Sequence, residues 1–260
     1  MSITDEGHYG PKQLNLLKVV WGEGFLSPGG TVEIDEIMKG IDASGNTVLD
    51  IGCGCGGGAI HLIKNHGAKS VVGIDIESLV IQRANKLAVK YNLSNLAHFR
   101  CVKPGPLDIP DESVDLVFSK EVFLHISNND GLMKDIYRIL KPRGLVVVSD
   151  WMRIDDNPPS KQMQEYIAAE GLDMYMCSLK SYEQALKKAG FIEIAIKDRN
   201  VWYLDKAKKE LAAIEGPLTQ LIIDVIGPEE TTGAINIWKK LIKVLERGEH
   251  RPGHFKAIKK

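Results

Sequence analysis

A short apolar stretch that runs directly into a glycine-rich turn is the feature that most limits how this 260-residue chain can fold. Residues 48–58 read VLDIGCGCGGG, with Asp50 just before the first glycine. Glycines at such a turn let the backbone approach a ligand closely at the start of the next helix. Because a glycine pattern alone is a weak signal, we interpret it only as a strand, a turn and a helix beside a candidate cofactor site.

The chain between residues 46 and 150 alternates strand-like and helix-like patterns. Strand patterns cover residues 47–53, 70–76, 96–102, 114–119 and 145–151, and helical patterns cover residues 59–66, 79–92 and 132–140. A turn is predicted at residues 141–144. Strands joined through helices pair in parallel, because such a crossover cannot be a tight hairpin. This rhythm predicts an α/β fold with a doubly wound, mostly parallel sheet.

The segments on either side of this core have different patterns. Apolar residues at helical spacing between 11 and 22 predict a helical lid within residues 1–45. After the core at 46–150, residues 151–260 show helical patterns at 160–171, 179–189, 201–215 and 235–246, with strand patterns at 191–197 and 254–259. We expect this last part to contain a helical insertion that lines the substrate pocket, together with the last strands of the sheet.

Composition and charge exclude several classes of function. A formal net charge of -1 offers no field that would gather phosphate backbones or anionic lipid, so we expect no nucleic-acid partner. The first residues lack the basic and apolar parts of a signal peptide, and no run of 18 apolar residues occurs. We therefore expect no membrane association and a cytoplasmic location.

The cysteines and histidines indicate neither a disulfide framework nor a metal site. The four cysteines are scattered and are interpreted as reduced thiols. His250 and His254 lie four residues apart without a paired cysteine motif, which favours a surface or structural role. We predict no metal.

Asp75 stands at the end of the next strand pattern, 25 residues after Asp50, where a carboxylate can accept both hydroxyls of a nucleoside's ribose. Two cofactor classes compete for this arrangement. A dinucleotide oxidoreductase holds a pyrophosphate at the start of the helix, where the negative charge of Asp50 would repel it. S-adenosylmethionine instead carries a positively charged sulfonium and an amino-acid tail, which tolerate a nearby carboxylate. Asp50 therefore favours an S-adenosylmethionine-dependent methyltransferase over an oxidoreductase.

The turn resembles the first motif of class I methyltransferases, E/DxGxGxG. Residues 110–117 and 140–144 are similar to the family's fourth strand and to the turn before its fifth. The resemblance implies a Rossmann-like, seven-stranded sheet and S-adenosylmethionine contacts from Asp50, Gly52, Gly54, Gly56, Asp75 and Ile76. The acidic residue that meets the adenine in the family is replaced near residues 101–104, and Asp108 is a candidate substitute.

Over nearly its full length the chain resembles the phosphoethanolamine N-methyltransferases and their glycine, sarcosine and dimethylglycine methyltransferase relatives. The similar segments are residues 22–30, 119–126, 165–167 and 253–257. The resemblance implies that Ser27 and Lys120 contact the cofactor and that Tyr9 and His125 form a catalytic pair that closes the site. Such a pair suits amine methylation, since only a neutral amine can attack, and histidine titrates in the required range.

The resemblance departs at the phosphate site. Where the phosphoethanolamine enzymes carry tyrosine, arginine and tyrosine, this chain retains Tyr166 but has Glu170 in place of the arginine, which should repel a phosphate. Trp151 likewise replaces a tyrosine. We therefore predict that the acceptor is a small, non-phosphorylated amine or amino acid. The residues predicted to bind it are Glu121, Trp151, Tyr166 and Glu170, where aromatic faces would hold a methylated ammonium.

Two alternatives stay open. The first is a phosphoethanolamine N-methyltransferase with a rearranged phosphate site, in which Arg153, Lys239 or Lys240 supplies the missing cation. The second is a protein that binds S-adenosylmethionine without catalysis. In each case we expect a small-molecule partner and a monomer or homodimer.

Overall fold

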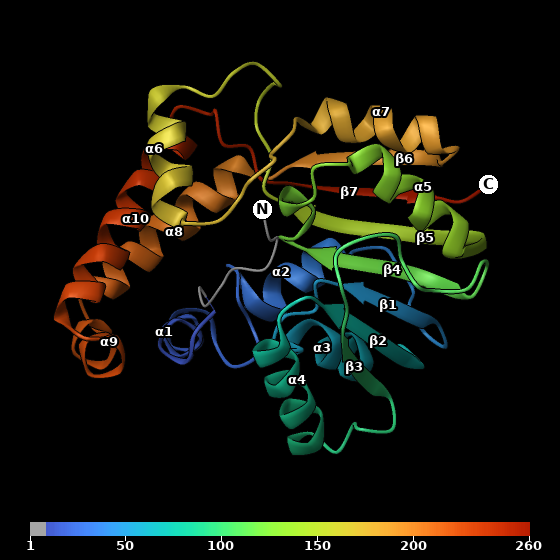
Figure 1. Ribbon diagram of the computed structural model, residues 1–260, viewed down its shortest axis with the longest axis horizontal. Coiled ribbons are helices and arrows are strands. Elements are labelled where there is room, and N and C mark those ends of the chain that lie inside the picture. The colour runs from blue at the N-terminus through green and yellow to red at the C-terminus, as the bar shows by residue number, and fades with distance from the viewer. Residues whose placement is uncertain (1–8) are drawn as a thin grey trace.

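The computed structural model describes residues 9–260 (Figure 1). Within that part of the chain seven strands form one sheet in the order β3-β2-β1-β4-β5-β7-β6, and β7 runs antiparallel to both of its neighbours. The strands are β1 (Thr47–Ile51), β2 (Ser70–Asp75), β3 (Ala97–Cys101), β4 (Val114–Lys120), β5 (Leu140–Asp150), β6 (Ile192–Asp198) and β7 (Gly253–Ile258). The predicted doubly wound, mostly parallel, seven-stranded sheet is confirmed.

Helices cover both faces of this sheet and extend beyond one end of it. They are α1 (Pro11–Trp21), α2 (Gly30–Ile37), α3 (Gly57–His66), α4 (Ser78–Lys90), α5 (Asn129–Ile139), α6 (Lys161–Glu170), α7 (Leu179–Ala189), α8 (Asn200–Ile214), α9 (Thr219–Ile226) and α10 (Pro228–Glu246). A short 3-10 helix, η1 (Phe123–His125), follows β4. Within residues 9–260, no helix combines the length and the apolar character that crossing a bilayer requires.

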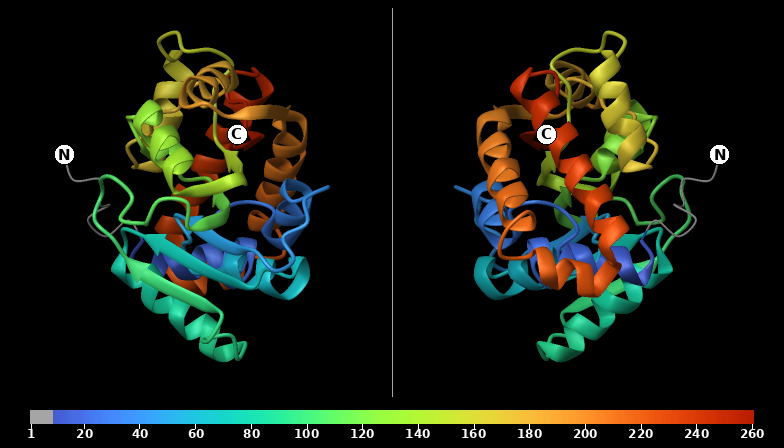
Figure 2. Two further views of the ribbon diagram at one scale, coloured as in Figure 1. Left: turned by 90° about the vertical axis from the view of Figure 1, so that its right-hand side faces the viewer. Right: turned by 90° about the vertical axis from the view of Figure 1, so that its left-hand side faces the viewer.

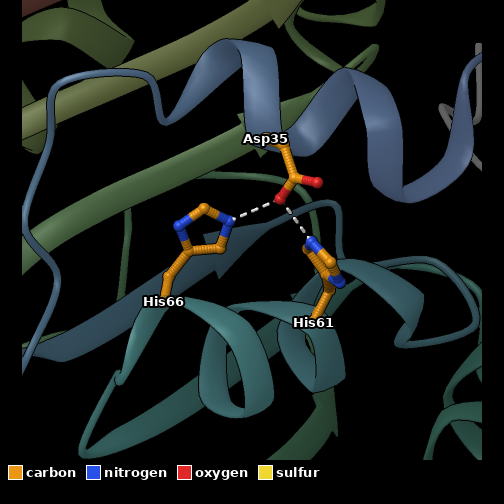
Figure 3. A group of neighbouring side chains, drawn as sticks. All are labelled: Asp35, His61 and His66. Atoms are coloured by element: carbon orange, nitrogen blue, oxygen red, sulfur yellow. Dashed lines mark hydrogen bonds and ion pairs between the residues drawn. The ribbon is translucent and has the colours of Figure 1, made fainter.

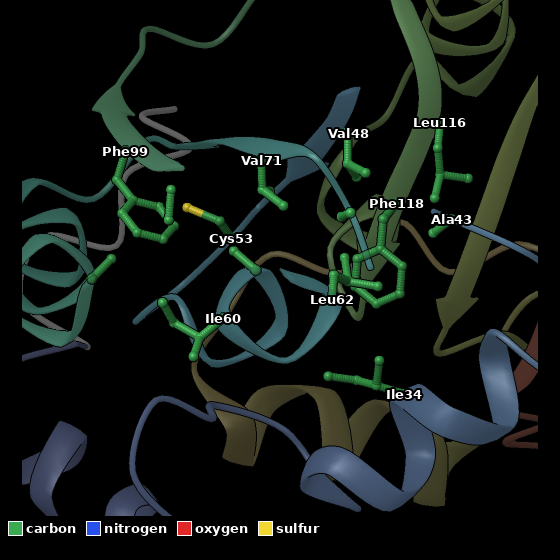
Figure 4. Close-up of a cluster of buried hydrophobic side chains, with 14 of the residues drawn as sticks. Ile34, Ala43, Val48, Cys53, Ile60, Leu62, Val71, Phe99, Leu116 and Phe118 are labelled. Carbon is green, nitrogen blue, oxygen red and sulfur yellow. The ribbon is translucent and has the colours of Figure 1, made fainter. Parts of the chain in front are cut away.

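The alternation of side chains along the central strands buries both faces of the sheet. In β1, Val48 packs on one face with Ile34, Leu62 and Phe118, against α2, α3 and α4 (Figure 4). Leu49 and its alternate neighbours face the opposite side, where α5 and α7 cover the sheet. Successive side chains of a strand point to opposite faces of the sheet. Because helices cover both faces here, the central strands need apolar residues at almost every position.

The remaining helices form a separate layer at one end of the sheet. Helices α6, α8 and α10 share an apolar cluster that includes Leu124, just beyond β4. Helix α1 packs on α9 although the two are about 200 residues apart in sequence (Figure 1). Seen from the left-hand side of Figure 1, α8 and α10 lie in front of the sheet (Figure 2). This layer lies beside the carboxyl ends of the strands.

Three elements differ from the sequence predictions. Helix α2 was not predicted and begins directly after residues 22–29, where Gly29 has a φ of 90°, and α9 was not predicted either. The predicted turn at 141–144 falls within the bounds of β5, where the strand bulges: Leu140 pairs with Val114 and Leu145 with Leu116, and Arg143 has a φ of 65°. The amide of Arg143 donates to the carbonyl of Lys259 (3.1 Å), and the amide of Lys259 donates to the carbonyl of Gly144 (2.8 Å). The local bend is therefore present, but contacts with β7, more than 100 positions away, make it part of the sheet.

Candidate active site

A cavity of about 1320 Å³ opens at the carboxyl ends of the parallel strands. Its walls include the residues that end or follow β1, β2, β3, β4 and β5, together with residues from α1 and from the segment after α6. Ligands in open α/β sheets bind at this edge, outside the carboxyl ends of the strands. The topology therefore brings residues from many elements, between positions 9 and 174, to one site.

The glycine-rich turn forms the floor of this cavity. Gly52 has a φ of 70°, and a Cβ atom there would lie 2.1 Å from a methyl carbon of Val122. Gly57 makes a similarly close contact with the backbone of Gly24, whose carbonyl accepts a hydrogen bond from the Gly57 amide at 3.0 Å. Side chains at these positions would force the backbone segments apart. The glycines are therefore required by packing as well as by access to the cavity.

Asp75 is the last residue of β2 and lies beside the glycine-rich turn. Its carboxylate fixes the conformation of this turn through hydrogen bonds. One carboxylate oxygen accepts the amide of Gly54 at 2.9 Å, and the other accepts the amide of Glu77 at 3.0 Å. Burial raises the pKa of Asp75, and these two backbone hydrogen bonds oppose that effect. A carboxylate has about four acceptor positions, so each oxygen can accept a further hydrogen bond from a ligand hydroxyl in the cavity.

Lys120 ends β4 and ties the segment before α2 to the sheet. Its ammonium donates to Ser27 Oγ at 2.5 Å and to the Pro28 carbonyl at 2.9 Å. The Glu121 carboxylate lies 3.6 Å from the same ammonium. Burial lowers the pKa of Lys120, and the charge of Glu121 partly compensates. Ser27, Lys120 and Glu121 all line the cavity.

Glu121 adopts a φ of 58°, a conformation that is uncommon outside glycine and that turns its side chain back toward β5 and α8. One oxygen, Oε1, accepts hydrogen bonds from the hydroxyls of Ser149 and Tyr203. The second oxygen is buried and has no hydrogen-bond partner among residues 9–260. A buried acceptor without a partner is costly unless a ligand supplies a donor.

His125 lies in η1 and lines the cavity together with Tyr9. Its Nδ1 atom lies 2.8 Å from the Asp173 carbonyl oxygen. A carbonyl only accepts, so Nδ1 carries the proton and Nε2 of the neutral ring keeps its lone pair. Burial lowers the pKa of His125 despite this hydrogen bond. The ring is therefore neutral at pH 7 and can accept a proton at Nε2.

The far end of the cavity is built from aromatic rings and a carboxyl group. The Trp151 ring lies 5.4 Å from the His250 ring and 6.4 Å from the Tyr166 ring, measured between centroids. Burial raises the pKa of Glu170 to about 7, with the Tyr166 hydroxyl opposing the effect. Trp151 Nε1 and His250 Nε2 are buried and lack hydrogen-bond partners within the described residues.

A smaller cavity of about 280 Å³ adjoins this end and shares Trp151 and Glu170 with the first. Residues of α1, α9 and α10 form its other walls, including Trp21, Ile226 and Trp238. Trp151 and Glu170 therefore stand between the strand-end cavity and an apolar space inside the helical layer.

The structure brings eleven of the predicted site residues to the large cavity. These are Tyr9, Ser27, Gly52, Gly54, Asp75, Ile76, Lys120, Glu121, His125, Trp151 and Glu170. Asp50, Gly56 and Tyr166 do not line it. Asp50 is 2% exposed and points toward the start of α3, Gly56 packs against Ala84 and Phe99, and Tyr166 is buried behind Trp151. Asp108, the candidate substitute near the adenine, does line it.

Two polar residues near the acceptor end were not assigned to it from the sequence, although His250 was given a surface or structural role and is in fact fully buried. Tyr203 donates to Glu121 from α8, 82 residues away, and His250 packs on Trp151 from the segment before β7. No spacing or motif links these positions, because only the return of the chain after α10 and the packing of α8 bring them to the site. Only positions whose amino acids vary together among related sequences could reveal these two contacts from sequence.

The cations that could have replaced the missing arginine lie elsewhere. Arg153 contacts the Asn157 carbonyl at 2.7 Å and Glu249 at 3.6 Å, while Lys239 pairs with Glu215 at 2.7 Å. Lys240 lies 3.4 Å from the carbonyl of Glu165. None of the three lines the large cavity as far as the structure describes it. The acceptor end therefore carries Glu121 and Glu170 without these three cations.

Comparison with known proteins identifies the kind of site. Residues 42–214 match a family described as a methyltransferase domain, and this stretch is more than half of the chain. The chain belongs to this family. The methyltransferase prediction is thereby confirmed, and the glycine-rich turn with Asp75 lies inside the matched region.

The relatives of this methyltransferase include phosphoethanolamine N-methyltransferases. Phosphoethanolamine N-methyltransferase 3 of Arabidopsis thaliana is 33% identical over 92% of this chain and 47% of its own length. The enzyme of Plasmodium falciparum (isolate 3D7) is 26% identical over 98% of this chain and 92% of its own length. This methyltransferase thus spans about half the length of the plant relative.

A solved structure of such a relative has the same fold. Phosphoethanolamine N-methyltransferase 2 of Haemonchus contortus, in complex with phosphomonomethylethanolamine and S-adenosylhomocysteine, superposes with a TM-score of 0.89 at 25% sequence identity. The alignment covers 99% of this methyltransferase and 59% of the other chain.

Proposed function

We propose that this protein N-methylates a small, non-phosphorylated amine, with S-adenosylmethionine as the methyl donor. The observation that carries the proposal is Glu170, a carboxyl group that lines the acceptor end of the cavity, combined with the location of Arg153, Lys239 and Lys240 elsewhere. A phosphate beside Glu170 would be repelled, whereas an ammonium would be attracted, and Glu121 has its charge partly compensated by Lys120 at 3.6 Å.

The residues near the glycine-rich turn fit the cofactor. Asp75 retains acceptor positions for the two ribose hydroxyls, and the glycines at 52 and 54 let a ligand lie against the backbone. Near the adenine end, Cys101, Val102 and Asp108 line the cavity. When bound, S-adenosylmethionine supplies an electrophilic methyl group on its sulfonium.

The acceptor residues prepare the amine for attack. The ionised Glu170 attracts the cationic form of the amine, and the unpartnered oxygen of Glu121 can accept one of its N–H groups. His125, neutral at pH 7, accepts the proton through Nε2, because only the free base has a lone pair for the methyl carbon. Tyr9 and the segment that follows it close the cavity, and alignment of the amine in a dry site accounts for much of the rate.

The second candidate acceptor is phosphoethanolamine, which the names of the relatives favour. The two candidates make opposite predictions for Glu170. If the acceptor carries a phosphate, replacing Glu170 by a neutral or cationic residue should help binding. If the acceptor is a plain amine, the same change should harm binding.

The test offers ethanolamine, glycine, sarcosine and phosphoethanolamine side by side and measures S-adenosylhomocysteine and methylated product by mass spectrometry. We expect a plain amine to give the highest kcat/KM, and Glu170→Arg to shift the preference toward phosphoethanolamine, with Glu170→Gln as the matched neutral control. A highest kcat/KM for phosphoethanolamine with the unaltered protein would contradict the proposed acceptor. Cofactor binding without product from any acceptor would favour a non-catalytic protein.

A further inference from the structure

Two histidines and an aspartate meet outside the cavity, on the side of the sheet covered by α2 and α3. Asp35 lies on α2, and His61 and His66 lie on α3 (Figure 3). Nε2 of His61 is 2.6 Å and Nε2 of His66 is 2.9 Å from the same carboxylate oxygen of Asp35. The three candidate ligand atoms all lie within 4.8 Å of one another.

The surroundings of these three side chains favour a bound metal ion over hydrogen bonds that only link α2 to α3. The side chains of His61 and His66 are 10% and 17% exposed, so their rings are held by packing, with their Nε2 atoms directed at one point. Asp35 is 56% exposed and leaves one side of that point open to solvent. The Asp35 carboxylate lies between the two imidazole rings and supplies an anionic ligand beside two neutral ones.

We propose that Asp35, His61 and His66 bind one divalent transition-metal ion, such as zinc, with a fourth position open to water. Imidazole and carboxylate are established zinc ligands, and three protein ligands with one open position form a known coordination pattern. Tetrahedral bonds of about 2.1 Å set ligand atoms about 3.4 Å apart, so the two contacts to Asp35 need to open by less than about 1 Å. The protons on the two Nε2 atoms move to Nδ1 or to solvent as the metal binds.

A metal at this point would join two segments of the cofactor site. Helix α2 follows the Ser27 turn that Lys120 holds, and α3 begins at the glycine-rich turn. An ion that binds only the folded protein stabilises it by an amount that grows with the logarithm of the ion concentration above Kd, so zinc should raise the melting temperature. The proposal does not depend on which acceptor is methylated, because none of its three residues lines the cavity.

The test is a calorimetric titration of zinc chloride into protein without a histidine tag. Because Cys101 is an exposed thiol that would itself bind zinc, all proteins carry Cys101→Ser. Asp35→Asn, His61→Asn and His66→Asn are compared with His98→Asn, a matched control at an exposed histidine outside the cluster. We expect one zinc per chain, an affinity at least about tenfold weaker in each cluster variant, and no change in the control.

A second measurement keeps the proposal testable if a cluster variant fails to fold. Copper(II) added to the otherwise unaltered Cys101→Ser protein should give an electron paramagnetic resonance signal with hyperfine structure from two imidazole nitrogens. The melting temperature should rise with zinc but not with magnesium. The proposal is overturned if zinc binds no tighter to this protein than to Asp35→Asn, or if the copper signal shows no nitrogen coupling. The cluster would then be a hydrogen-bonded link between α2 and α3.

Discussion

Lys120 at the end of β4 and Ser27 before α2 are joined by a hydrogen bond of 2.5 Å between Nζ and Oγ. This contact spans 93 residues and closes one wall of the cavity, with Glu121 beside it. The lid segment is therefore positioned by the same strand end that carries the acceptor carboxylate.

Replacing Lys120 by methionine should destabilise the fold and weaken cofactor binding. The change leaves Glu121 buried without its cation, and breaking a buried pair in this way costs about 3 kcal/mol of unfolding free energy. Chemical denaturation and calorimetry with S-adenosylmethionine measure the two effects. Lys187→Met, which breaks only the exposed contact with Glu183, is the control and should change stability by less than about 1 kcal/mol. Equal effects of the two changes would contradict the structural role of Lys120.

Replacing Asp75 by alanine should weaken S-adenosylmethionine binding by about tenfold to a hundredfold, since hydrogen bonds to a charged acceptor are lost. Asp75→Asn is the informative companion, because an asparagine keeps an acceptor oxygen for one of the two backbone amides while losing the charge. We expect it to fall between the unaltered protein and Asp75→Ala in a calorimetric titration. Undiminished affinity in Asp75→Ala would remove Asp75 from the ribose site.

Replacing His125 by alanine should lower kcat by about a hundredfold or more, the range for removal of a general base. Cofactor affinity should change little, because the predicted role concerns the proton of the amine. The matched control is His98→Ala at an exposed position. Steady-state kinetics and calorimetry separate the two quantities, and an unchanged kcat would exclude His125 from proton removal.

The affinity for a plain amine should follow the ionisation of Glu170. With a pKa of about 7 the carboxyl is neutral below that pH and anionic above it, so KM for the amine should fall as pH rises from 6 to 8. Ordinary aliphatic amines stay protonated throughout this window, so the change reports the protein group. Glu170→Gln should make KM independent of pH there. The same slope in the variant would assign the titration to another group.

Asp50 should make the protein less stable as pH rises. Burial raises its pKa from 3.8 to about 8, with the charge of Asp75 adding to the effect. Between these values the folded state holds a proton that the unfolded state releases, so unfolding free energy falls by about 1.4 kcal/mol per pH unit for this group. Asp50→Asn should flatten this dependence in denaturant titrations from pH 5 to 8. A parallel slope in the variant would show that Asp50 ionises normally.

The sequence predicted the residues at the carboxyl ends of the strands better than those inside them. Asp75 and Trp151 were assigned to the site from their places at strand ends, and Lys120 from the family resemblance, and all three line the cavity. Asp50 was also assigned to it, but period-two alternation places its side chain on the same face as Val48, toward α3.

Other features depend on contacts that no local pattern encodes. Tyr203 reaches Glu121 because α8 packs on α10 with its first turn beside Ser149 of β5, and the cluster of Asp35 with the two histidines depends on how α2 crosses α3. His61 and His66 are five residues apart, a spacing that zinc fingers use together with a pair of cysteines, but no such cysteine pair accompanies them here. The prediction of no metal rested on sequence spacing alone and stays untested by the structure.

The helices α8, α9 and α10 are inserted between two strands that are paired with each other. Asp198 at the end of β6 is opposite Gly253 at the start of β7, and the amide of Arg199 donates to the Pro252 carbonyl at 2.8 Å. The chain thus leaves and re-enters the sheet at a single point, like a loop on a hairpin. Both ends of the inserted helices are therefore held at one edge of the sheet, so a change in their length or sequence leaves the register of β6 and β7 unaltered.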